Sequence, residues 1–146
     1  MSSKKEECLK EIEEVKASHL QLMESIDLAI SGIDTDYFEP LDKHECKFGK
    51  WFYNNELAKV ILGLQAYERL EQIHAQWHQI YAKIFHLLFP KKNGILKKLL
   101  KSKPQPQDID RAKAYYDDLK ELTNNLIHDL EIAKKRAQAL NDSKFH

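Results

Sequence analysis

The sequence predicts an all-α protein, an antiparallel four-helix bundle with a short additional helix that carries a cysteine ligand. Apolar residues recur at helical spacing over long stretches, Gly and Pro number only four each, and 32% of the residues are charged. This composition is typical of long, solvent-exposed helices and does not suit a β-rich domain. A chain of 146 residues is long enough to bury a core, so we expect one domain over residues 1–146.

The first long helix is expected from about Ser3 to about Ile30. Ser3 and Glu6 have the spacing of a capping box, and Gly32 follows the last apolar position, where a left-handed cap is common. His19 falls on the apolar stripe of this helix, which otherwise consists of Leu9, Ile12, Val15, Leu22, Met23, Ile26 and Ile30.

Residues 34–45 are predicted to be a connecting loop, and Cys46–Tyr53 a short helix or turn whose aromatic residues anchor it to the core. Within it, Gly49 allows a close approach to another backbone. The second long helix is expected from Leu57 to about Phe89, with Gly63 as a break or a close helix crossing. We expect the fourth bundle position to be filled either by the short helix together with the segment that leads to it, or by a split of this run at Gly63.

Residues 91–107 are interpreted as a basic, proline-containing connector in solvent, although their lysines are also compatible with an anionic lipid, a nucleic acid or an acidic partner. The last helix is expected from about Asp108 to about Leu140. Acidic residues begin it and Lys and Arg crowd its end, as the helix dipole favours.

Charge and targeting signals narrow the function classes. Lys plus Arg and Asp plus Glu both number 23, so the formal net charge is +0, which gives no reason to expect nucleic acid. The charged N-terminus does not resemble a signal peptide, and no stretch is apolar over the length of a bilayer. We therefore expect a cytoplasmic protein without membrane contacts, whose two cysteines form no structural disulfide.

Three histidines point to a metal site. His74 and His78 lie four residues apart, so their imidazoles project from one helix face a turn apart. Burying them together with His19 and no shared partner would leave several hydrogen bonds unmade, a penalty that one metal ion removes. With Cys46 as the fourth ligand, this donor set predicts tetrahedral zinc. The alternative at this point is that the histidines are ordinary core residues.

Other metal sites and ligands are less well supported. A di-iron site needs paired Glu-x-x-His motifs, and Glu71 with His74 supplies only one. Haem ligation lacks a motif. His44 is an alternative ligand near the cysteine, while Cys8 is expected to be a surface or half-buried thiol. Of the remaining histidines, we expect His86 at the edge of the core and both His128 and His146 in solvent.

The motif pattern resembles the chemoreceptor zinc-binding domain (CZB) family in order and spacing. The resemblance directly covers residues 19–78 and departs from the family at Gln21, where a large apolar or aromatic residue is frequent. It implies a four-helix bundle and a three-His, one-Cys zinc site. The matching elements are His19, the segment Cys46-x-Phe48-Gly49-x-Trp51, and His74-x-x-x-His78.

In that family, such domains belong to bacterial chemotaxis receptors and diguanylate cyclases and are proposed to sense zinc or hypochlorous acid through the zinc-bound cysteine. The resemblance therefore implies a non-enzymatic sensor domain. We expect it to stand alone, to form a homodimer and to act on a signalling protein in trans. The alternatives are a protein-interaction module with a constitutive structural zinc, and a zinc hydrolase, for which Glu71 is not clearly placed as a base.

Overall fold

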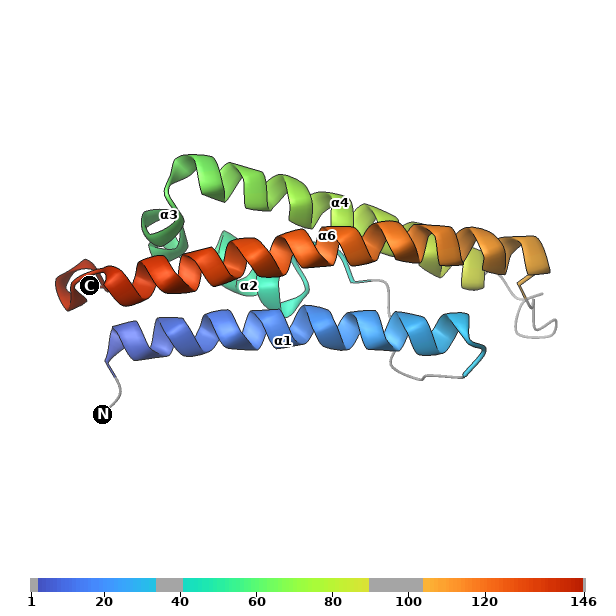
Figure 1. Ribbon diagram of the computed structural model, residues 1–146, viewed down its shortest axis with the longest axis horizontal. Helices are drawn as coiled ribbons and strands as arrows, with labels where there is room; N and C mark the ends of the chain where they lie inside the picture. Colours follow the sequence, from blue (N-terminus) through green and yellow to red (C-terminus); the bar gives the residue numbers. More distant parts are fainter. Residues whose placement is uncertain (1–2, 34–40, 90–103, 146) are drawn as a thin grey trace.

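The computed structural model of the chain describes residues 3–33, 41–89 and 104–145, and all regular structure in these ranges is helical (Figure 1). The predicted all-α class is therefore confirmed. The elements are α1 (Lys4–Ile30), α2 (Lys47–Tyr53), α3 (Glu56–Leu62), α4 (Leu64–Leu88), α6 (Pro106–Ala139) and a final 3-10 turn, η1 (Asp142–Phe145).

The three long helices lie side by side (Figure 1). Helices α1 and α4 run in the same direction, and α6 runs antiparallel to both and packs against both. The short helix α2 packs against α1, while α3 packs against α4 and α6. The short helix after the cysteine and the split of the second long helical run, which the sequence offered as alternatives, are both present.

Capping residues determine where the first and last long helices begin and where the first one ends. The Ser3 hydroxyl accepts a hydrogen bond from the Glu6 amide at 3.1 Å, which caps α1. Gly32 has a φ of 84° just beyond the end of α1, as predicted. Helix α6 starts two residues earlier than expected, because Pro106 suits the first helical turn and Gln105 forms the N-cap. The rest of the predicted connector, residues 91–103, lies outside the described residues.

A break between α3 and α4 occurs at Gly63, which is one of the two predicted alternatives. Its φ of 79° is in the left-handed region that favours glycine. The Arg136 guanidinium from α6 donates a hydrogen bond to the carbonyl of Leu62 at 2.6 Å. This contact satisfies a carbonyl at the C-terminus of α3 that has no helical partner.

The core consists of two apolar clusters at opposite ends of the bundle. The first joins the N-terminal halves of α1 and α4 to α2, α3 and the C-terminal half of α6, and includes Ile12, Phe52, Leu70 and Leu126. The second joins the C-terminal halves of α1 and α4 to the start of α6, and includes Ile26, Trp77, Ile84 and Leu119.

Two predictions about single residues were wrong. Cys8 is only 1% exposed, because it shares the apolar stripe of α1 with Ile12 and belongs to the same cluster as Phe145 from the returning C-terminus. His86 is exposed rather than at the core edge, whereas His128 is exposed as expected. Within the described ranges, no helix combines the length and apolarity that crossing a bilayer requires.

Candidate metal centre

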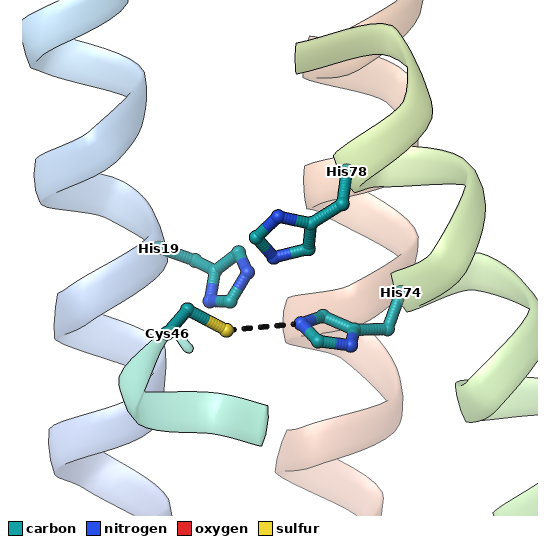
Figure 2. Close-up of side chains that lie close together, drawn as sticks. All are labelled: His19, Cys46, His74 and His78. Carbon is teal, nitrogen blue, oxygen red and sulfur yellow. Dashed lines mark hydrogen bonds between the residues drawn. The ribbon is translucent and has the colours of Figure 1, made fainter. Parts of the chain in front are cut away.

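Four buried side chains meet near the middle of the bundle. The potential ligand atoms of His19, Cys46, His74 and His78 all lie within 4.8 Å of one another. Figure 2 shows His19 reaching in from α1, both other histidines from α4, and the cysteine from the start of α2. The structure therefore brings together the four residues that the sequence singled out, in a group positioned to bind a metal ion. Their individual assignment as ligands stays a prediction.

The long helices hold the three imidazoles close together. The rings of His74 and His78, one turn apart on α4, have centroids 4.6 Å apart. The His19 ring centroid lies 5.3 Å from the first of these rings and 5.8 Å from the second. All three side chains are less than 7% exposed. Three nitrogen donors thus come from α1 and α4, and both of these helices are held in position by packing against α6.

Cys46 reaches the group because it is the N-cap of α2. Its Sγ accepts a hydrogen bond from the Gly49 amide at 3.3 Å and lies 3.2 Å from Nε2 of His74 (Figure 2). A Cβ at Gly49 would overlap the carbonyl oxygen of Lys43. The predicted need for a close backbone approach is therefore confirmed. The turn before α2 closes tightly enough to direct the sulfur inward only because this residue has no side chain.

Unpaired nitrogen atoms show that the group suits a cation. Both ring nitrogens of His19 and Nε2 of His78 are buried without a hydrogen-bond partner among the described residues. The other nitrogen of His78, Nδ1, lies 2.9 Å from the carbonyl of Leu41 and must donate its hydrogen to it. The Nε2 atom of His78 then carries no hydrogen, and its lone pair is available to a metal ion. Leaving such atoms unpaired costs about 1–3 kcal/mol each, a cost that metal coordination removes.

Burial sets the protonation states of the metal-free group. It lowers the pKa of His19 to about 3, with a further contribution from repulsion by His78. It likewise lowers the pKa of His74 to about 2, so the imidazoles are neutral at pH 7, which is the form that binds metals. Burial raises the pKa of the Cys46 thiol to about 11. Metal binding at neutral pH would therefore release one proton from the sulfur.

Sequence reasoning did not identify two groups that contact the histidines. One is the backbone carbonyl of Leu41, which a side-chain pattern cannot reveal. The other is the Tyr53 hydroxyl, 3.4 Å from Nδ1 of His74. The only available signal was its position seven residues after the cysteine, which is two turns along the same helix face. The proposed substitute ligand His44 does not belong to the group; it is exposed, and its ring packs against Tyr53 at 4.4 Å.

An all-helical bundle with a buried three-His, one-Cys group defines a metal-binding domain, and this donor set is typical of zinc. The chemoreceptor zinc-binding domain (CZB) family model matches residues 19–85, which include the whole group. Residues 19–85 are therefore similar to the CZB family, in agreement with the resemblance of the sequence motifs. Zinc is therefore the metal that the group is positioned to bind. Comparisons with curated proteins and with solved structures gave no match.

Proposed function

We propose that the protein is a zinc-binding regulatory module in which Cys46 is the responsive ligand. The observation that supports this proposal is the unequal anchoring of the four side chains. The three histidines belong to helices of 27 and 25 residues, whereas the cysteine caps a helix of seven residues. A chemical change at the Cys46 sulfur therefore acts on α2, the shortest of the three helices that contribute to the site.

The chemistry of the switch is oxidation of the sulfur. Bound zinc keeps a cysteine as the thiolate, which is the form that oxidants attack. In the net step, the Cys46 sulfur gains the OH group of hypochlorous acid and becomes a sulfenic acid. The O–Cl bond breaks and chloride leaves with the bonding pair, so sulfur is oxidised by two electrons and chlorine is reduced by two.

The added oxygen would act on α2 directly. The Cys46 sulfur accepts the Gly49 amide hydrogen bond that caps this helix, and Phe48 in the first turn of the same helix packs with its ring centroid 4.1 Å from that of His74. Weakening of the sulfur's bonds would loosen the start of α2 while the histidines stay in place. We infer that this change is the output, read in bacterial signalling by a partner protein or by a second copy of the chain.

Controlled oxidation tests the proposal. Zinc-loaded protein is treated with equimolar hypochlorous acid, and modification is mapped by mass spectrometry while helicity is followed by circular dichroism. We expect modification of Cys46 and a loss of helicity that Cys46→Ala abolishes. Cys8→Ala is the matched control, because this second buried thiol lies in the apolar cluster. An unmodified Cys46, or the same helicity change in Cys46→Ala, would contradict the proposal.

A constitutive structural zinc is the second candidate, favoured by the position of the site between the two apolar clusters. Sensing of the zinc level instead requires that the ion exchanges. Isotopic exchange of bound zinc distinguishes the two, because a structural zinc exchanges only as fast as the bundle unfolds. Exchange much faster than global unfolding, measured by hydrogen exchange of the α6 amides, would support sensing.

A further inference from the structure

A polar network lies beside the four-residue group. The Tyr53 hydroxyl on α2 forms a short hydrogen bond with the carboxylate of Glu71 on α4 and faces Nδ1 of His74 at 3.4 Å. Glu71 precedes this histidine by three residues, almost one helical turn. Lys43 Nζ lies 2.7 Å from the same carboxylate and 5.6 Å from the centre of the Tyr53 ring.

The direction of each hydrogen bond follows from the donors available. An ionised carboxylate only accepts, so the Tyr53 hydroxyl donates its hydrogen to Glu71. The phenolic oxygen then accepts from Nδ1 of His74, and the ring carries its hydrogen on that atom. Nε2 is left with its lone pair, and this is the nitrogen that faces the Cys46 sulfur at 3.2 Å. The network therefore selects the tautomer of His74 that can bind a metal through Nε2.

We propose that Tyr53 and Glu71 are positioning residues of the zinc site, forming a carboxylate–tyrosine–histidine relay that fixes the ring orientation and the tautomer of His74. Lys43 holds the carboxylate in place. The proposal concerns zinc affinity, and it stands whether or not Cys46 acts as a redox switch. Outer-shell partners of this kind typically contribute 10–100-fold to metal affinity.

The environment of the relay suits this role. Tyr53 is partly buried and the Glu71 side chain is 29% exposed, so their hydrogen bond lies in a less polar medium than water and is correspondingly stronger. The Lys43 side chain is 36% exposed, and its ion pair with Glu71 alone is worth little. We therefore expect the tyrosine and the carboxylate, rather than the lysine, to carry most of the effect.

The relay also joins two segments of the site. Lys43 and Tyr53 flank Cys46 on either side in the sequence, and both contact the same carboxylate of α4. Glu71 thus holds both ends of the cysteine-bearing segment against the helix that carries His74. Loss of the relay should weaken zinc binding by loosening the sulfur donor as well as one imidazole.

Competition with a chromophoric chelator measures the zinc affinity of Tyr53→Phe and Glu71→Gln. We expect each to bind zinc about 10–100-fold more weakly, and the double variant to be no weaker than the worse single one, because the two act in series. Tyr67→Phe is the matched control. Its hydroxyl also joins α4 to α2, at 3.3 Å from the carbonyl of Phe52, but touches none of the four residues.

Nitrogen NMR of labelled histidines in the zinc-loaded protein reports the tautomer of each ring. The signal of His74 alone should change if Tyr53 positions that ring, whereas a general loss of stability would not single it out. In Tyr53→Phe we expect the Nδ1–H signal of His74 to shift and to exchange faster with water, while that of His78, bonded to Leu41, is unchanged. Wild-type affinity in both single variants would overturn the proposal. So would an equal loss in Tyr67→Phe, or equal shifts in both histidines.

Discussion

The indole Nε1 of Trp77 donates a hydrogen bond to the Thr123 hydroxyl at 2.8 Å, in a pair that is buried on both sides. The hydroxyl in turn donates to the Leu119 carbonyl one turn earlier on α6. The same indole packs at 4.6 Å from the His19 ring. One polar contact between α4 and α6 therefore supports the wall of the metal centre.

Thr123→Val should destabilise the protein by about 1–3 kcal/mol, because it keeps the side-chain shape and leaves the Trp77 N–H buried without an acceptor. Urea denaturation measures the change. Thr123→Ser retains the hydroxyl and should lose less stability. If valine were no worse than serine at this position, the hydrogen bond would contribute nothing net to stability.

Protein purified without added metal should contain about one zinc per chain, which is the stoichiometry of a single four-ligand group. Substitution of His19, His74 or Cys46 by Ala should remove or weaken this zinc, as measured by atomic emission. His128→Ala is the control, because that residue is exposed on α6. Zinc content that is indifferent to all three substitutions would refute the assigned ligand set.

Zinc removal should lower stability in proportion to occupancy. If zinc binds only the folded chain, about 100-fold excess of free zinc over its dissociation constant adds about 2.7 kcal/mol to the free energy of unfolding. Urea titrations at buffered free zinc levels test this linkage. Each further tenfold rise in free zinc should add about 1.4 kcal/mol, and a flat dependence would show that zinc does not bind the folded state selectively.

The metal-free protein should lose stability as the pH falls below about 6.5. Burial holds the pKa of His19 near 3, whereas the unfolded chain binds a proton at the ordinary histidine value. Stability is therefore complete above the unfolded pKa and decreases from there towards pH 3, by up to about 1.4 kcal/mol per pH unit for each such histidine.

The comparison of His19→Gln with the metal-free wild type isolates this effect. Between pH 6.5 and 4.5, the free energy of unfolding from urea titrations should fall less steeply with decreasing pH in the variant than in the wild type. The difference between the two slopes should correspond to close to one bound proton. His86→Gln, at an exposed position, should leave the slope unchanged. Equal slopes in all three proteins would mean that His19 is not a buried neutral imidazole in the metal-free fold.

Gly49→Ala should destabilise the segment before α2 by about 3 kcal/mol or more, because the added methyl group would meet backbone rather than a movable side chain. The nearest backbone atoms belong to Lys43 and His44. Zinc affinity and thermal stability should both fall. Lys50→Ala, at the exposed neighbouring position, should change neither; a tolerated alanine at position 49 would mean that this turn is not as tight as described.

Much of the fold follows from periodicity. The stripes of α1, α4 and α6 extend over many turns, so their helical period was clear, and Ser3 and Gly32 marked the ends of the first helix. Gly63 could be interpreted as a break or as a close crossing, because glycine suits both. The left-handed φ of 79° and the contact of Arg136 with the Leu62 carbonyl show that it is a break, and this arginine lies 74 residues from Leu62 in the sequence.

The grouping of the four residues could be predicted because it depends on side-chain chemistry and on spacing within short stretches of the sequence. His74 and His78 are on one face of one helix, and the cysteine motif has its own turn glycine. The environment of the site was not predictable. The Leu41 carbonyl and the Tyr53 hydroxyl reach the histidines only after distant segments pack together, and Cys8 is covered by the far end of the chain.

Each long helix crosses from one apolar cluster to the other at the level of the metal centre. On α6 the crossing point is Thr123, between Leu126 and Leu119, and on α1 it is His19, between Val15 and Met23. The boundary between two potential foldons therefore runs through these polar residues. Zinc held at the boundary would join both halves into one cooperative unit, and its removal would let either end open on its own. Metal occupancy would then govern the extent of cooperativity while the helical architecture stays the same.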